Sequence, residues 1–329
     1  MKTAVVILNY NTRQYLKQFL PGLIASCEGM DAGVIVADNA SADDSRKLMQ
    51  KEFPQVPLIC LDQNYGFTGG YNRALSQVQA QYFVLINSDI EVPRGWMGPL
   101  VDWMDAHPDC GACGPKLLSF HQRDTFEYAG AAGGLIDRYG YPFCRGRILQ
   151  KVEKDHGQYD DPAPVLWCSG ACLMVRASVW KALGGLDERF FAHMEEIDLC
   201  WRMQLRGWSV NLVPASYVYH IGGGTLPNES PFKLRLNFRN NLLLLENNLP
   251  STLQSRFRTR LRILVRMGLD GCSALVYLIR GKKDFFRAVI LAHREYRQLR
   301  KPGELLPDAP KPAGLYRGWI VPIGLFGKK

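Results

Sequence analysis

Carboxylate and amide side chains follow each of the first four apolar runs of the sequence. The runs span residues 4–8, 34–37, 58–61 and 82–86, and the polar residues that follow them are Asn9, Asp38, Asn64, Asn87 and Asp89. In an open parallel sheet the carboxyl ends of the strands share one edge, and ligands bind in the crevice at that edge. The sequence therefore predicts that Asp38, Asn64 and Asp89 lie together at the mouth of a binding site. The alternative for each of them alone is a turn or a helix cap, which Asn and Asp also favour.

A second acidic group lies at the start of a helix that we expect over residues 194–206. Glu195 and Glu196 are adjacent, and Glu195, Asp198 and Arg202 fall on one stripe of that helix. Adjacent carboxylates repel each other and raise each other's pKa, which favours a general base near neutral pH. The alternative is a solvated acidic helix start that the helix dipole stabilises.

Strands and helices must alternate to position these groups. Segments of helical length separate the four apolar runs, which predicts an α/β fold with a parallel sheet covered on both faces. Thr12 is expected to cap the first helix, and Ser41 with Asp44 has the spacing of a capping box. The Gly-rich residues 110–165 are typical of a long loop or a pair of edge strands, and residues 165–175 of a buried segment.

The charge divides the chain into two regions. The 329 residues carry a net charge of +9, and a hydrophobic content of 47% excludes disordered, collagen-like and coiled-coil proteins. Residues 233–329 hold 20 Lys/Arg and 6 Asp/Glu, a net charge of +14, whereas residues 1–232 hold 20 and 25, a net charge of −5. We expect a catalytic domain over residues 1–230 and a basic, mainly helical region over residues 231–329.

The basic region predicts amphipathic helices. Arg258, Arg262 and Arg266 recur every four residues, while Phe257 and Leu261 occupy a different face. Such helices can lie on an anionic membrane surface. The alternative is a pair of helices that pack on the catalytic domain with solvated arginines outside. Binding of nucleic acid is a further alternative, although the sequence has no aromatic and glycine RNA motif and no recognisable helix-turn-helix.

No apolar segment has the length of a signal peptide core or a membrane span. The first run ends after residue 8, and the longest candidate, residues 267–279, is interrupted by Asp270. Nine cysteines, an odd number, indicate free thiols in a reducing compartment. Cys110 and Cys113 have zinc-ligand spacing but no second pair or histidine at a matching interval. The sequence therefore predicts a cytoplasmic protein.

Six short motifs occur in order along residues 1–250. They span residues 38–41, 64–72, 87–89, 167–174, 184–200 and 220–226. Together they resemble the motifs of family 2 glycosyltransferases, and within them the bacterial rhamnosyltransferase-like subgroup. The resemblance implies the GT-A fold, which has a Rossmann-like, mostly parallel sheet with helices on both faces.

The resemblance assigns the sheet edge to a nucleotide sugar. The donor-binding residues it implies are Asn9, Asp38, Asn64, Gly66, Gly69, Gly70, Asn72 and Asn87. The glycines among them are expected where the backbone passes close to the donor, because side chains would obstruct that approach. The residues implied on the acceptor side are Trp167, Gly170 and Ala171.

The resemblance also implies a metal and a catalytic base. Asp89 and His220 are the expected ligands of a divalent cation, Mg²⁺ or Mn²⁺. Asn87 stands where the family motif Asp-x-Asp has its first acidic residue, which lowers the expected metal affinity. Glu196 stands in the place of the usual catalytic Asp, with Glu195 and Asp198 beside it, and its longer arm can serve if the acceptor lies about one methylene further away.

The implied function is the inverting transfer of a sugar such as rhamnose from a nucleoside diphosphate donor to a hydroxyl of a glycan. The implied donors are dTDP-rhamnose or a UDP-sugar. The acceptor is a glycan or a lipid-linked saccharide at the inner face of the cytoplasmic membrane, in the synthesis of cell-surface polysaccharide. Two alternatives stay open: a degenerate family member that only binds the nucleotide sugar, and a basic nucleic-acid-binding protein.

Overall fold

The structure is a computed structural model that describes residues 1–222 and 230–326. Its larger sheet contains β1 (Thr3–Asn9), β2 (Ala32–Asp38), β3 (Leu58–Cys60), β4 (Tyr82–Ile86), β5 (Ile90–Glu91), β6 (Cys110–Ser119), β11 (Ala163–Pro164), β12 (Cys172–Arg176) and β13 (Ser209–His220). The strand order is β11-β13-β6-β12-β4-β1-β2-β3, and β5 pairs with β13. β4, β1, β2 and β3 are parallel as expected, but β12 is antiparallel to both β4 and β6, so the sheet is mixed.

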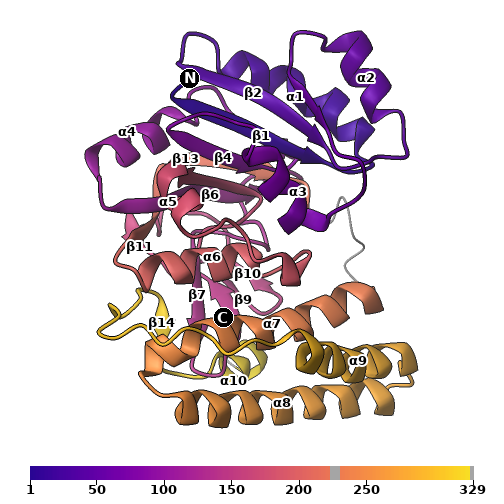
Figure 1. Ribbon diagram of the computed structural model, residues 1–329, viewed down its shortest axis with the longest axis vertical. Helices are drawn as coiled ribbons and strands as arrows, with labels where there is room; N and C mark the ends of the chain where they lie inside the picture. Colours follow the sequence, from indigo (N-terminus) through magenta and orange to yellow (C-terminus); the bar gives the residue numbers. More distant parts are fainter. Residues whose placement is uncertain (223–229, 327–329) are drawn as a thin grey trace.

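Helices cover both faces of this sheet (Figure 1). They are α1 (Arg13–Ser26), α2 (Ser45–Glu52), α3 (Gly66–Leu75), α4 (Gly98–Ala106), α5 (Ala177–Ala182) and α6 (Glu195–Gln204). Alternate residues of β1 point to opposite faces: Val5 and Ile7 pack in the core with α1, α2 and α4, and Ala4 and Val6 in the core with α3, α5 and α6. This burial on both faces explains why the strand reads as a continuous apolar run.

The predicted helix caps differ from the observed ones. Thr12 does precede α1, but its hydroxyl donates to Asn9 Oδ1 at 2.6 Å and does not cap the helix. The capping box predicted for Ser41 and Asp44 is wrong, because α2 begins only after Asp44. The Ser41 hydroxyl instead accepts hydrogen bonds from the Asn9 side chain and the Asn11 backbone, which ties together the ends of β1 and β2.

Residues 110–165 are expected from the sequence to form a long loop or edge strands, and for the first ten of these residues this expectation is wrong. β6 is a ten-residue strand inside the sheet, between β12 and β13. Glycine is required within it, because a Cβ on Gly114 would lie 2.7 Å from the Cys168 Cβ. The glycines that suggested a loop therefore allow close packing in a core strand.

The rest of this segment forms most of a second, five-stranded sheet. Its strands are β7 (Gly134–Asp137), β8 (Pro142–Cys144), β9 (Arg147–Ile148), β10 (Lys151–Val152) and β14 (Leu315–Tyr316), in the order β10-β9-β8-β7-β14. β14 comes from the far C-terminal part of the chain and pairs in parallel with β7. The second sheet thus joins the C-terminal region to the body of the protein.

The C-terminal region is helical, as expected. Its helices are α7 (Pro231–Leu253), α8 (Arg256–Ile279), α9 (Lys283–Leu299) and α10 (Ile320–Phe326). α7 packs against α6 on one side and against α8 and α9 on the other, and α8 forms the outer edge of the molecule (Figure 1). No helix in the described ranges is both long and apolar enough to cross a membrane.

Candidate active site

A cleft of about 490 Å³ opens at the carboxyl ends of β1 and β4, beside the first turns of α3, α6 and α7. The predicted site residues that line it are Asn64, Gly66, Asn87, Asp89, Gly170, Ala171, Glu195, Glu196 and His220. Residues from widely separated motifs therefore share one cavity. The prediction from strand ends holds for Asn64 and Asp89, while Asp38 lies behind the cleft wall.

Asp38 and Asn9 form a closed network below the cleft. The Asp38 carboxylate is 1% exposed and accepts hydrogen bonds from Asn9 Nδ2 at 2.9 Å, the Ser41 backbone at 3.1 Å and Arg46 Nε at 2.5 Å. Burial raises the pKa of Asp38, but these hydrogen bonds outweigh it and hold the pKa below its ordinary value. Asp38 thus stays ionised as a support of the sheet edge, and its contact with a nucleotide stays a prediction.

The glycines of residues 64–72 have different roles from those expected. Only Gly66 lines the cleft, and its φ of +69° suits glycine. A Cβ on Gly70 would lie 2.7 Å from the Leu8 side chain, and one on Gly69 would lie 2.9 Å from the Tyr65 Cβ. Gly70 therefore allows α3 to pack closely on β1, and Gly69 leaves room for Tyr65 at the start of the same helix; neither lines the cleft, and their contact with a donor stays a prediction. Asn72 holds the backbone of Leu186 through both ends of its amide.

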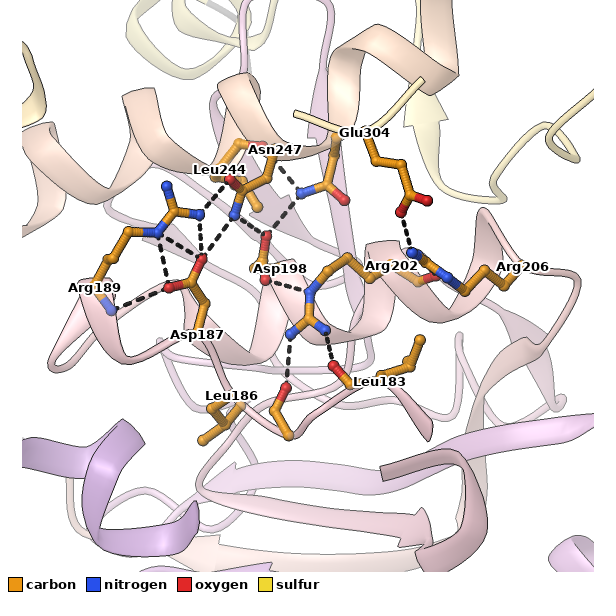
Figure 2. Close-up of polar contacts among 12 residues, drawn as sticks. Leu183, Leu186, Asp187, Arg189, Asp198, Arg202, Arg206, Leu244, Asn247 and Glu304 are labelled. Carbon is orange, nitrogen blue, oxygen red and sulfur yellow. Dashed lines mark hydrogen bonds and ion pairs between the residues drawn. The ribbon is translucent and has the colours of Figure 1, made fainter. Parts of the chain in front are cut away.

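Trp167 and Asp198 also lie outside the cleft. The Trp167 ring packs on Gly134, where a Cβ would be 1.9 Å away, and its Nε1 donates to a backbone carbonyl of β7. Asp198 is fully buried and accepts from Arg202 Nε at 2.6 Å and from Asn247 and Asn248 at 2.9 Å each. Figure 2 shows Asp198 between Arg202 and Asn247, facing α7. Asp198 therefore joins α6 to α7 and orients the helix from outside the cleft, and a catalytic role for it stays a prediction.

Glu195 and Glu196 occupy the first turn of α6 and face the cleft. Glu195 is 4% exposed and Glu196 is half-buried, and one carboxylate oxygen of each has no hydrogen-bond partner among the described residues. Burial raises the pKa of both groups, and in Glu195 the neighbouring Glu196 raises it further. Glu196 is the less buried residue of the two, so it is the better placed to take a proton from a ligand.

Asp89 and His220 lie side by side in the cleft, because Asp89 directly precedes β5 and His220 ends β13, with which β5 pairs. Asp89 Oδ1 lies 3.2 Å from His220 Nε2, and Glu127 Oε2 lies 3.5 Å from His220 Nδ1. Burial lowers the pKa of His220, but the contacts with the two carboxylates outweigh this effect and raise the pKa to about 10. Glu127 lies in the segment expected to be a loop, so no signal in the sequence marked it. The other end of the sixth motif, residues 223–226, lies outside the described residues.

An unusual backbone segment presents the two glutamates to the cleft. Phe191, His193 and Met194 have φ values of +64°, +72° and +70°, although none of them is glycine. Asn240 on α7 is fully buried and donates from Nδ2 to three backbone carbonyls of residues 190, 192 and 193. The C-terminal helix α7 thus stabilises a conformation that costs free energy in isolation.

Several residues that line the cleft were not among the predicted site residues, although Phe67, Phe191 and His193 lie within the motifs 64–72 and 184–200. Phe67, Phe191 and Phe232 give the cleft apolar surface, and His193 and Lys233 add ionisable groups. Burial lowers the pKa of Lys233, and burial together with Lys233 lowers the pKa of His193 to about 4. Lys233 therefore adds a second basic group, besides His220, to a cleft that also contains carboxylates.

The Glycosyl transferase family 2 model matches residues 4–184. The chain belongs to this family. Its residues 4–184 include the strand ends that line the cleft, and the resemblance seen in the six motifs is confirmed. The protein is a glycosyltransferase.

Curated relatives and a solved structure agree with this assignment. The glycosyltransferase is 29% identical over 234 residues to the N-acetylglucosaminyl-diphospho-decaprenol L-rhamnosyltransferase of Mycobacterium tuberculosis, covering 66% of this chain and 75% of the relative. It is 25% identical over 226 residues to the rhamnosyltransferase WbbL of Escherichia coli K12, covering 66% and 82%. The mannosyltransferase PcManGT from Pyrobaculum calidifontis, solved with GDP-Man and Mn²⁺, has a TM-score of 0.54 at 12% identity and covers 91% of this chain and 88% of its own. The fold is GT-A.

Proposed function

We propose that this glycosyltransferase transfers L-rhamnose from dTDP-rhamnose to a hydroxyl of a lipid-linked saccharide, with inversion at the anomeric carbon. The single observation that carries the proposal is the shared cleft, in which Glu196 lines the same cavity as the pair Asp89 and His220. A direct displacement has two requirements, and the cleft offers a group for each. A base must take the proton of the acceptor hydroxyl, which is the proposed role of Glu196, and charged groups must stabilise the leaving diphosphate, which is the proposed role of Asp89 and His220 with a bound cation.

Glu196 is the proposed base of this displacement. Its carboxylate takes the proton of the acceptor hydroxyl while that oxygen forms a bond to the anomeric carbon. The bond from the anomeric carbon to the diphosphate oxygen breaks in the same step, and the nucleoside diphosphate leaves with the electron pair. Because attack and departure occur on opposite faces of the sugar, the configuration inverts. Raised pKa values in this carboxylate pair suit a base that works near neutral pH.

Asp89 and His220 are the proposed holders of a divalent cation. They would hold the ion through Asp89 Oδ1 and through His220 Nε2 once its proton is displaced, two atoms that lie 3.2 Å apart. Among residues 1–222 and 230–326, no three His, Cys, Asp or Glu side chains cluster as a complete ligand set. A site with only two protein ligands suits Mg²⁺ or Mn²⁺, because these ions take their further ligands from water and substrate phosphates. When bound, the ion supplies Lewis-acid stabilisation of the leaving diphosphate.

Other residues that line the cleft are proposed to bind the diphosphate and to exclude water. Lys233 is proposed to neutralise negative charge on the departing diphosphate, since a lysine binds phosphate as a point charge. The apolar surface of Phe67 and Phe232 is proposed to exclude water from the reacting atoms. The rhamnosyl donor is supported by both relatives above, which are rhamnosyltransferases, and the lipid-linked acceptor by the Mycobacterium tuberculosis relative alone, whose name specifies a diphospho-decaprenol saccharide. Such an acceptor implies work at the inner face of the cytoplasmic membrane.

A panel of nucleotide sugars tests the proposal. Purified protein is titrated calorimetrically with dTDP-rhamnose, UDP-sugars and GDP-mannose in the presence of Mg²⁺ or Mn²⁺, and the anomeric configuration of the product is read by NMR. We expect the tightest binding for dTDP-rhamnose and an inverted product. A retained anomeric configuration would exclude the direct displacement, and preference for another donor would exclude rhamnose. Donor binding without any turnover would instead indicate the degenerate family member.

A further inference from the structure

The helix α8 turns charged residues towards the protein interior and apolar residues towards the outside, the reverse of the usual amphipathic arrangement. Its buried side, towards α7 and the second sheet, contains Arg266 and Asp270, which form an ion pair of 2.8 Å. Arg266 also lies over the Tyr141 ring at 3.9 Å, and Arg262 donates to the Arg138 carbonyl. Both sequence-based alternatives placed these arginines on the outside, and for Arg262 and Arg266 that expectation is wrong.

The outward side of α8 is apolar along its whole length. Exposed side chains recur at the spacing of one helix face and comprise Phe257, Leu261, Leu264, Leu275 and Ile279, with the small residues Gly268 and Cys272 between them. Phe257 is 77% exposed, Leu264 64% and Ile279 84%. From residue 257 to residue 279 this stripe is about 33 Å long at about 1.5 Å per residue. Contiguous apolar surface of this length marks an interaction site.

Positive charge borders the apolar stripe. Residues 256–300 hold 12 Lys/Arg and 3 Asp/Glu, a net charge of +9. Arg258 and Arg260 are exposed at one end of α8, and Arg280 at the other. Of the three acidic residues, Asp270 is buried and the Glu295 carboxylate lies 3.4 Å from each of two arginines of α7. The one acidic side chain that stays exposed, Asp284, lies 3.6 Å from Arg287.

We propose that the outward face of α8 is a membrane-binding surface, on which the helix lies in the interface of an anionic bilayer. The stripe then enters the acyl boundary while the bordering arginines meet lipid phosphates. A second copy of the chain fits this face less well, because two such faces would bring like charges together with almost no exposed carboxylate to offset them. Figure 1 shows α8 along the edge of the molecule opposite the larger sheet, where it can meet a flat surface.

This inference names the partner of the C-terminal region, and it rests on the proposed function only in that a lipid-linked acceptor lies at such a surface. Flotation of the full-length protein with vesicles is the test, with pure phosphatidylcholine compared with phosphatidylcholine that contains phosphatidylglycerol. We expect binding to the anionic vesicles that weakens as salt rises, because salt screens exposed charges.

Two sets of variants separate the two parts of the surface. Leu264→Ser with Leu275→Ser is expected to weaken binding at least tenfold, at all salt concentrations. Arg258→Ala with Arg260→Ala is expected to weaken it about thirtyfold at low salt, which corresponds to about 1 kcal/mol for each basic residue. Arg94→Ala removes an exposed arginine of the catalytic domain and is the matched control, with unchanged flotation expected.

The proposal is overturned if wild-type protein does not float with anionic vesicles at low salt, or if the serine variant floats as the wild type does. It is equally overturned if the wild type is a dimer in solution that the serine variant converts to monomer, because the face then binds a second copy. Donor binding by the same variants is measured in parallel. Normal donor binding with lost flotation separates this surface from the cleft, so failure of one proposal is distinguishable from failure of the other.

Discussion

Replacing Asn240 by aspartate is expected to disable transfer while donor binding is nearly retained. The Asn240 amide donates at 2.9 Å to the carbonyl of Phe190, at 2.7 Å to that of Ala192 and at 2.8 Å to that of His193. An ionised aspartate has the same size but no hydrogen to donate, so it would set a negative charge against three carbonyl oxygens. The segment that carries Glu196 into the cleft then loses its main support.

Two free-energy terms of similar size decide the conformation of this segment. Backbone held at positive φ costs about 1–3 kcal/mol for each non-glycine residue, so Phe191, His193 and Met194 together cost about 3–9 kcal/mol. A buried polar group left without a partner costs about 1–3 kcal/mol, and removal of the two amide hydrogens of Asn240 leaves about two backbone carbonyls without one, a cost of about 2–6 kcal/mol. Since the two costs are comparable, we expect the segment to leave its positive-φ conformation in the variant. A displacement of about 1 Å at a catalytic group lowers the rate about a hundredfold.

The assay compares kcat, donor affinity and thermal unfolding for the variant and a matched control. We expect kcat to fall at least about a hundredfold with a donor Kd within about threefold of wild type, which indicates a lost transition-state interaction. Asn211→Asp is the control, because Asn211 is also buried and its amide donates to Ser209 on β13, away from the cleft. This control should lower the melting temperature without changing kcat. If Asn240→Asp fails to fold, Asn240→Ala gives the same readout without the added charge, and a folded variant of either kind with near-normal kcat refutes the reasoning.

The remaining predictions concern the ionisable groups of the cleft. Glu196→Gln should lower the rate of transfer about 10²- to 10⁴-fold with donor binding unchanged. Because burial raises the pKa of Glu196 above 4.5, wild-type activity should fall as the pH decreases through this raised pKa. If the Gln variant keeps both its activity and the same loss of activity at low pH, another residue is the base. His220→Ala should raise the Mn²⁺ concentration needed for half-saturation about tenfold or more, measured by the paramagnetic signal of free Mn²⁺, and unchanged affinity would exclude it as a ligand. Lys233→Met should weaken donor binding about 10- to 100-fold, from a charged hydrogen bond of about 1.5–3 kcal/mol, whereas the exposed Lys17→Met control should bind normally.

The first half of the sheet could be predicted because its strands are short apolar runs with polar ends. The carboxyl-end rule then placed Asn64 and Asp89 in one cavity without any knowledge of side-chain contacts. The same rule wrongly placed Asp38 in the cleft, because its carboxylate is instead hydrogen-bonded to Arg46, Asn9 and the Ser41 backbone. Whether a polar group at a strand end faces a ligand or a neighbouring side chain depends on tertiary contacts, which a single sequence does not contain.

Glycine gave the least reliable signal. Gly114 lies inside a core strand and Gly70 inside the packed face of α3, yet both were associated with loops or with a donor. A glycine is required where two segments approach closely, and the partner segment is often distant in sequence, as Cys168 is from Gly114. The same limitation hid Glu127, which reaches His220 only because β6 and β13 pair side by side.

The basic charge of the C-terminal region had suggested a separate task for it, but its innermost helix completes the cleft. α7 contributes Lys233 to the lining and Asn240 to the support of the positive-φ segment, and its Asn247 and Asn248 hold Asp198 on the back of α6. α8 packs directly on α7, so the proposed membrane surface and the glutamates of α6 belong to one stack of helices. If α8 lies on a bilayer as proposed, that contact would fix the orientation of the cleft relative to the lipid. Acceptor specificity would then follow in part from this orientation, because only a hydroxyl presented at the right height above the lipid would reach Glu196.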